Sequence, residues 1–187
     1  MKIHIEHPWS TEGNYGKAIN ESFSKIGEDD WLCILDWDVM FIHPESITQM
    51  YEYVRLLPDA GLLTCFATRI GQHAQRWNNK KSGDPDFMNH YRLADRIVKR
   101  NRNGYTRMTD SMSGFLHLVS KKTWNEIKYT EEKIYLWVDD NFCKQLYAAG
   151  KEIYRMDGIY IWHSYRLWKD SKDREHLKFN GSFGSAK

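Results

Sequence analysis

The sequence predicts an α/β fold, a mixed sheet flanked by helices and built as a single domain. Two apolar runs, Trp31–Leu35 and Leu62–Phe66, are almost free of polar residues. Such runs are typical of strands that are buried on both faces, as in a parallel sheet covered by helices. Between them, apolar residues from Ile47 to Val54 recur at helical spacing. Because strand and helix alternate here, we expect the second apolar run to lie parallel to the first.

Local signals predict the other elements of the first half. A short strand is expected at Lys2–Glu6, because Pro8 stops the run that begins there. The next helix carries its apolar residues on one face and is expected to end near Gly27. A further helix opens at Pro44, a residue that suits the first turn, and closes at Pro58.

The second half begins with a polar stretch that interrupts this alternation. We expect a loop at Gln72–Asp86, helices at Phe87–Arg100, Thr123–Ile127 and Asp139–Ala149, and strands at Ser113–Val119, Ile153–Tyr154 and Ile159–Trp162. Long loops inside compact domains are often binding loops or lids. The domain is expected to span residues 1–170, and residues 171–187 are expected to form a polar, partly disordered tail.

Length and composition favour a soluble globular protein. A chain of 187 residues buries roughly 70% of its unfolded surface, so it needs no disulfide for stability. Cys33, Cys65 and Cys143 are widely spaced in apolar surroundings, which favours core thiols over a disulfide framework or a zinc site. No apolar run reaches the length of about 18 residues that a membrane span needs, and Met1–Trp9 lacks the apolar region of a signal peptide. We therefore expect a cytoplasmic protein, free or peripheral to a membrane.

Charge is unevenly distributed along the chain. The net charge is only +2, yet the stretch Gly71–Arg107, here called the basic segment, contains nine basic and three acidic residues. Its net charge of +6 contrasts with −4 for the remainder. Such segregation predicts an anionic partner for the basic segment.

Two carboxylates, Asp36 and Asp38, follow the first buried strand one residue apart. Ligands of open α/β sheets bind at the carboxyl ends of the strands, and neighbouring carboxylates repel each other unless a cation joins them. A divalent metal, Mn²⁺ or Mg²⁺, or a metal-bound phosphate is therefore predicted here; the alternative is a solvated turn. The other Asp-x-Asp pair, Asp84 and Asp86, lies in the polar loop and is interpreted as solvated.

Asp139 and Asp140 open a predicted helix. An Asp at this point caps free backbone N–H groups and is favoured by the helix dipole, which accounts for one of the two. The other is suited to act as a general base. His163 ends the last predicted strand, where its imidazole either completes an oxygen-rich metal site or has a structural role.

Two basic positions are candidates for phosphate contacts. Asn14 to Lys17 opens a helix, so its backbone amides and Lys17 are suited to approach a phosphate, and a plain helix cap is the alternative. Arg166 follows the last strand and either meets a diphosphate or belongs to a solvated basic tail.

Several motifs in order resemble those of a glycosyltransferase of the Rossmann-like GT-A fold, closest to the family 2 type. They are Asn14–Asn20, Ile34–Asp38, Ser113–Phe115, Trp137–Asp140 and Ile161–His163. The resemblance implies a nucleotide-binding half followed by the basic segment as an insertion. It also implies a nucleotide-sugar donor, expected to be a UDP-sugar, contacted by Asp36, Asp38, Asn14, Lys17, Gly114 and Arg166.

The resemblance further implies roles for the acidic residues. Asp38 would be the direct metal ligand, Asp36 would lie nearer the ribose or the metal, and His163 would be a further ligand. Asp140, with Asp139 beside it, would be the catalytic base. The region before Asn14 is shorter than in usual members, so the chain is either a compact form, like short glycosyltransferases of bacteria and phages, or a fragment. His7, Pro8 and Trp9 are then the candidates for recognition of the base.

The expected activity is metal-dependent transfer of a sugar from a nucleotide-diphosphate sugar to an acceptor hydroxyl, with inversion. The basic segment would act as an acceptor lid for a carbohydrate or phosphate-bearing acceptor. One alternative is a metal-dependent nuclease or nucleic-acid-binding domain, in which the basic segment contacts a phosphate backbone. A sugar-binding domain of the same fold without turnover is the other.

Overall fold

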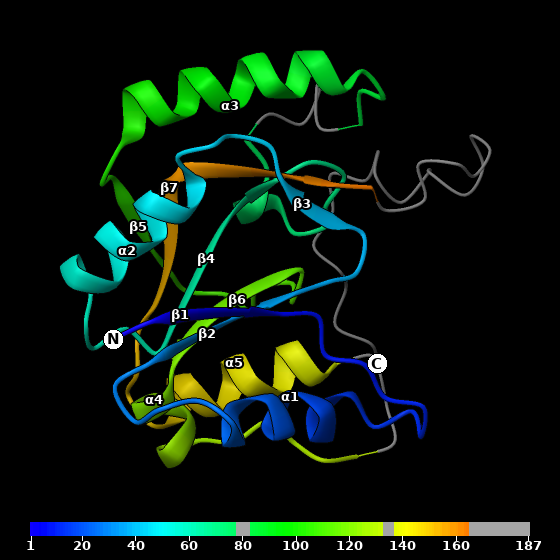
Figure 1. Cartoon of the computed structure of the whole chain (residues 1–187), viewed down its shortest axis with the longest axis vertical. Helices are drawn as coiled ribbons and strands as arrows, with labels where there is room; N and C mark the ends of the chain where they lie inside the picture. Colours follow the sequence, from blue (N-terminus) through cyan, green and yellow to red (C-terminus); the bar gives the residue numbers. More distant parts are fainter. Residues whose placement is uncertain (78–82, 133–136, 165–187) are drawn as a thin grey trace.

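The structure is a computed structural model that describes residues 1–77, 83–132 and 137–164. Within these residues seven strands form one sheet, in the order β1-β2-β6-β4-β7-β3, with β5 also paired to β7 (Figure 1). The strands are β1 (Ile3–Glu6), β2 (Trp31–Leu35), β3 (Val39–Phe41), β4 (Leu62–Ala67), β5 (Tyr105–Met108), β6 (Leu116–Ser120) and β7 (Ile153–His163). The helices are α1 (Tyr15–Ser24), α2 (Ser46–Leu56), α3 (Phe87–Asn101), α4 (Lys121–Glu126) and α5 (Val138–Ala148), with a 3-10 turn η1 (His73–Gln75). The predicted α/β class, a mixed sheet flanked by helices, is confirmed.

Local sequence patterns did not predict the order of the strands in the sheet. β1 is parallel to β2, and β4 is parallel to β7. Between these two parallel pairs lies β6, which is antiparallel to both β2 and β4. The second apolar run therefore has the direction predicted for it, but it is not a neighbour of the first.

The last strand differs from the prediction of two short strands. β7 is a single strand of 11 residues, and its register with β4 shifts between Cys65 and Phe66. Cys65 is paired with Met156, whereas Phe66 is paired with Tyr160, so an irregularity in β7 takes up the intervening residues. β3 and β5 were not predicted; both are short and pair with β7. Asp157 and Gly158, which are poor strand formers, fall within this irregularity and have no register partner in β3, β4 or β5.

Side chains of the two sheet faces pack against different helices. Cys33, Leu35 and Leu63 share a core with residues of α2, including Met50. Leu32, Ile34 and Leu62 face the other way, into a core formed with α1, α4 and α5. All three cysteines are buried and free, as predicted for core thiols. None of the helices in the described ranges is both long and apolar enough to span a bilayer.

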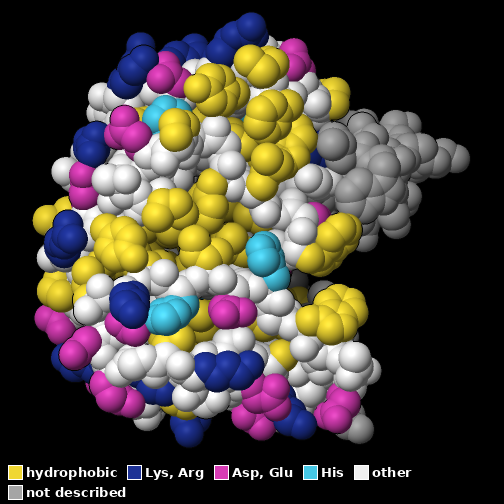
Figure 2. Space-filling view, in the orientation of Figure 1, with side chains coloured by type: hydrophobic (Ala, Val, Ile, Leu, Met, Phe, Trp, Pro, Cys, Tyr) yellow, Lys and Arg dark blue, Asp and Glu magenta, His cyan; other side chains and the backbone are white. Residues whose placement is uncertain are grey.

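The basic segment contains η1, α3 and the start of β5, and α3 packs against β7 through Leu93, Ala94 and Ile97. Its outward side chains include basic residues, and Figure 2 shows Lys and Arg side chains at the upper margin, where α3 lies in Figure 1. Part of the charge is used internally, because the buried Arg76 guanidinium donates to the carbonyl oxygens of Ile70 and Gly71. Lys80 and Lys81 lie outside the described residues.

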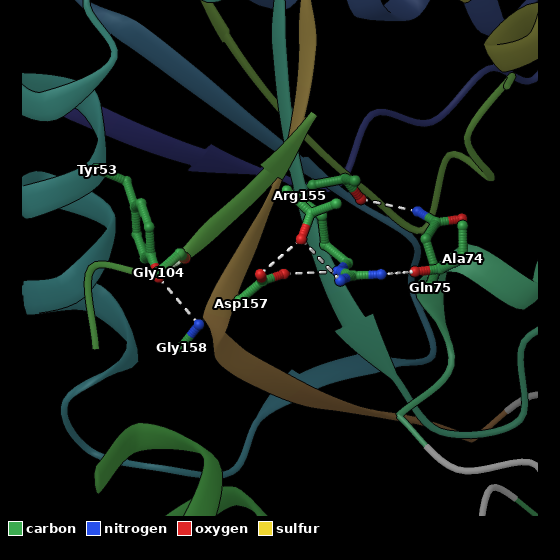
Figure 3. A network of polar contacts seen from close by, with 9 residues as sticks. Tyr53, Ala74, Gln75, Gly104, Arg155, Asp157 and Gly158 are labelled. Atoms are coloured by element: carbon green, nitrogen blue, oxygen red, sulfur yellow. Dashed lines mark hydrogen bonds and ion pairs between the residues drawn. The ribbon is translucent and has the colours of Figure 1, made fainter. Parts of the chain in front are cut away.

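A buried tyrosine holds the irregular part of β7 in place (Figure 3). Tyr53 Oη donates a hydrogen bond to the Gly104 carbonyl oxygen at 2.7 Å and accepts one from the Gly158 amide at 2.9 Å. A Cβ at Gly158 would crowd the Gln49 side chain and would lie 2.9 Å from the Tyr53 hydroxyl and 3.0 Å from the Asn101 carbonyl oxygen, so a larger residue requires these groups to shift. One hydroxyl thus joins α2 to both β7 and the turn before β5.

Replacing Tyr53 by Phe is expected to lower the free energy of unfolding by about 1–3 kcal/mol, because the buried Gly158 amide loses its partner. The Gly104 carbonyl oxygen loses one of its two hydrogen bonds and keeps the one from the Asp157 amide. The denaturation midpoint in urea measures this loss. Tyr51→Phe is the matched control, since among the described residues its hydroxyl accepts a bond only from the Ile3 amide near the edge of the sheet. Equal midpoints for the two variants would contradict the expectation.

A buried histidine makes stability depend on pH. His117 in β6 is 2% exposed, and its Nδ1 lies 3.0 Å from the hydroxyl of Tyr129. Burial lowers its pKa to about 4. The unfolded chain takes up this proton near pH 6.5, so the contribution to stability is complete above about pH 6.5 and is lost as pH falls towards about 4.

We expect the wild-type free energy of unfolding to fall by up to about 1.4 kcal/mol per pH unit in this window from His117 alone. In His117→Asn the amide oxygen replaces Nδ1 and does not titrate. The difference between the wild-type and variant pH slopes, measured by urea unfolding, isolates the effect. Parallel slopes would show that His117 is not its source.

Candidate functional site

Pairing between β3 and β7 brings together residues that are far apart in the sequence. Val39 is in register with His163, and the Ser164 amide donates to the Asp38 carbonyl oxygen at 2.8 Å. Asp38, directly before β3, therefore lies beside the last residue of β7. Asp36 follows β2, with its amide donating to the carbonyl oxygen of Phe115 at 3.1 Å. All three predicted metal residues meet at the carboxyl ends of β2 and β7.

The side chains of Asp36, Asp38 and His163 form a compact cluster. Each offers one ligand atom, and these atoms lie within 4.8 Å of one another. His163 Nε2 is 3.3 Å from Asp38 Oδ1, and these two side chains are 6% and 7% exposed. The His163 ring stacks on Phe115, with 5.9 Å between centroids. We call these three residues the Asp-Asp-His cluster.

The electrostatics of the cluster fit a cation. Burial raises the pKa of Asp36 to about 6, and the negative charges of Asp38 and Asp139 add to this, although His163 opposes it. A carboxylate so placed is costly to ionise without a nearby positive charge. Two carboxylates and one imidazole are a donor set suited to Mn²⁺, with Mg²⁺ as the harder alternative.

Asp139 and Asp140 lie in the first turn of α5, but neither is its cap, a position taken by Trp137 with a positive φ of 74°. Asp139 uses both carboxylate oxygens on backbone groups: Oδ2 accepts from the Gly114 amide at 2.8 Å and Oδ1 from the Asp140 amide at 2.9 Å. Burial raises its pKa, although these bonds oppose the shift. Asp139 therefore holds the Gly114 turn against α5.

Asp140 has a different environment from its neighbour. Its Oδ2 lies 2.5 Å from Lys144 Nζ, one helical turn further along. Burial alone would raise its pKa, but hydrogen bonds from Lys144 and Ser111 outweigh burial and bring the pKa below its usual value. Asp140 is thus a partly exposed carboxylate that is ionised at neutral pH.

Tyr15 is a site residue that was not predicted from the sequence. This residue opens α1, and its pKa is raised by burial and by the charges of Asp36 and Asp139. Its side chain therefore lies near both carboxylates. On the same side, His7 Nδ1 is 3.2 Å from the Asp36 carbonyl oxygen. The available signal for Tyr15 was its position beside Asn14 in the motif that resembles the family.

Three of the remaining residues predicted to bind the nucleotide sugar line a separate cavity. Trp9, Asn14 and Lys17 line a cavity of about 130 Å³ at the start of α1. Asn14 acts as a plain helix cap, accepting from the Lys17 amide at 2.9 Å, and Lys17 Nζ lies 3.4 Å from Glu12. Pro8 is half-buried in the same segment. Arg166 lies outside the described residues.

Exposed tryptophans flank the segments that carry the site. Trp37, between the two aspartates of the cluster, is 70% exposed, Trp9 is 71% exposed and Trp137 is 53% exposed. Figure 2 shows a notch in the right-hand margin of the molecule, bordered above and below by hydrophobic side chains. In Figure 1 this margin holds the carboxyl ends of β1 and β2.

Comparison with known proteins does not identify the family of this chain. No protein-family model matches the chain, and no curated protein matches it. The function must therefore be argued from the site itself.

Proposed function

We propose that this protein is a metal-dependent glycosyltransferase of the GT-A type, which moves a sugar from a nucleotide-diphosphate sugar to an acceptor hydroxyl with inversion. The observation that carries the proposal is the β3–β7 pairing, which joins Asp38 and His163 beside Asp36 at the carboxyl ends of the strands. In open α/β sheets this is the edge where ligands bind. The motif order that resembles the family supports the same function.

Asp36, Asp38 and His163 would hold the cation. When bound, Mn²⁺ or Mg²⁺ would supply positive charge for the leaving diphosphate. Asp140 is the proposed base: it is ionised through its contact with Lys144 and accepts the proton of the acceptor hydroxyl. Asp139 is a positioning residue, because its two oxygens fix the Gly114 turn and the start of α5. Attack from the face opposite the leaving group gives inversion.

A carbohydrate is the acceptor class that the surface favours. The exposed indoles of Trp9, Trp37 and Trp137 belong to the segments that carry the site. Indole rings combine a large apolar face with a polar N–H, which suits contact with sugar rings. The cavity beside Trp9 and Lys17 is the proposed place for part of the donor, a UDP-sugar in the first instance.

The decisive experiment incubates the protein with a panel of nucleotide sugars and measures release of nucleotide diphosphate with Mn²⁺, with Mg²⁺ and with a chelator. Release that depends on the metal and is selective for one donor supports the proposal. Binding of a donor without release would instead indicate a sugar-binding domain. Metal-dependent cleavage of nucleic acid, with no release from any donor, would indicate the nuclease alternative.

A further inference from the structure

A second cavity lies at the end of α3, away from the Asp-Asp-His cluster. It has a volume of about 270 Å³, and its lining includes Phe66, Trp77, Arg100, Arg102, Arg155 and Asp157. None of the residues that line it belongs to the Asp-Asp-His cluster. The cavity is therefore a site separate from the proposed reaction centre.

The floor of the cavity is a firmly held arginine (Figure 3). Arg155 lies over the Phe66 ring at 3.9 Å and donates from Nε to Asp157 Oδ1 at 2.7 Å. It also donates to the Ala74 carbonyl oxygen and, at 3.1 Å, to the hydroxyl of Thr106. A guanidinium has five N–H donors, so two of them have no partner among the described residues, although the side chain is only 15% exposed.

The charges of the cavity leave one cation uncompensated. Arg102 is neutralised by Glu45 and Glu52, at 2.7 Å and 2.5 Å. Arg100 makes no ion pair or hydrogen bond with the part of the chain that the structure describes. An anion in the cavity would therefore meet both Arg100 and the remaining donors of the arginine below it.

An aromatic wall adds a preference for a ring. Trp77 is 37% exposed and stands edge-on to Phe66, with 5.1 Å between ring centroids and an angle of 89°. Inorganic ions gain little from such a surface, whereas a ring-bearing ligand buries apolar area against it. The volume is just below the range of about 300–1,000 Å³ typical of small-molecule pockets, which limits the ligand to monosaccharide size.

We infer that this cavity binds a sugar unit that carries a carboxylate or a phosphate, with its anionic group at Arg100 and Arg155 and its ring against Trp77. The unit can be a free sugar acid or sugar phosphate, or one residue of an acidic glycan. The inference does not depend on the transferase activity, because binding requires neither donor nor metal. It also accounts for the positive charge of the basic segment, which supplies Arg100 and Trp77.

The test is a binding titration followed by ¹H–¹⁵N NMR, without metal or nucleotide. Glucuronate and glucose 6-phosphate are expected to shift the Nε–H signals of Arg100 and Arg155 and the indole N–H of Trp77 saturably. Glucose should not bind, and inorganic phosphate should bind about tenfold more weakly than glucose 6-phosphate. Equal binding of glucose, or equal binding of phosphate and glucose 6-phosphate, would overturn the inference.

Variants give the second half of the test. Arg100→Gln is expected to weaken glucuronate binding about tenfold or more, because a charged hydrogen-bonding partner is lost. Arg96→Gln removes an exposed charge from the same helix outside the cavity lining and should leave binding unchanged. An equal loss of glucuronate affinity in both variants would show that the ligand responds only to the overall charge of α3, and this would refute the site. A glucuronate trisaccharide distinguishes the sources: tighter binding than the monomer indicates a glycan, and equal binding indicates a free sugar.

Discussion

Replacing Asp38 by asparagine is expected to weaken Mn²⁺ binding by about 100-fold or more and to abolish metal-dependent release of nucleotide diphosphate. Asp38 is 3.3 Å from His163 and its side chain is only 7% exposed, so its carboxylate is held directly beside the imidazole. Loss of partners around a metal already costs about 10–100-fold in affinity, and loss of a ligand costs more. Isothermal titration with Mn²⁺ measures the change.

Folding is not expected to suffer in this variant, because asparagine has the same shape and removes a negative charge next to Asp36. Asp59→Asn is the matched control: Asp59 is a highly exposed residue whose only described ion pair is with Lys122. It should bind Mn²⁺ like the wild type. If Asp38→Asn keeps wild-type Mn²⁺ affinity, the Asp-Asp-His cluster is not the metal site.

Replacing Asp140 by asparagine is expected to lower the rate of sugar transfer by about 10²–10⁴-fold, the usual contribution of a general base. Mn²⁺ affinity should remain unchanged, because Asp140 faces Lys144 and Ser111, not the cluster. Single-turnover transfer and Mn²⁺ titration on the same preparation separate the two quantities. Glu126→Gln, an equivalent change in an exposed ion pair with Lys151, is the control.

Asp139→Asn should behave differently from Asp140→Asn. Both oxygens of Asp139 accept backbone N–H groups, and an amide offers only one acceptor oxygen. We therefore expect a lower thermal midpoint as well as slower transfer. Wild-type transfer by Asp140→Asn, together with an inactive but stable Asp139→Asn, would reverse the roles proposed for the two residues.

The fold class could be predicted from the sequence because buried elements show a local pattern of apolar residues. Trp31–Leu35 is buried throughout, and all five positions are apolar, so the run shows that both faces of β2 are covered. α2 likewise follows from the helical spacing of its apolar residues. β3 and β5 show no such apolar pattern, since each is only three or four residues long and partly exposed. Their extended form depends on hydrogen bonds to β7.

The candidate site also has features that follow from the local sequence and features that depend on the tertiary structure. The sequence by itself determined that Asp36 and Asp38 follow a buried strand, that Asp139 and Asp140 open a helix, and that His163 ends a strand, because each position is defined by its immediate neighbours. Only the tertiary structure decided that Asp38 meets His163, that Tyr15 lies near Asp36 and that Asp139, not Asp140, holds Gly114. These contacts depend on strand order and register, which are set by hydrogen bonds and packing between distant segments and have no counterpart in local periodicity.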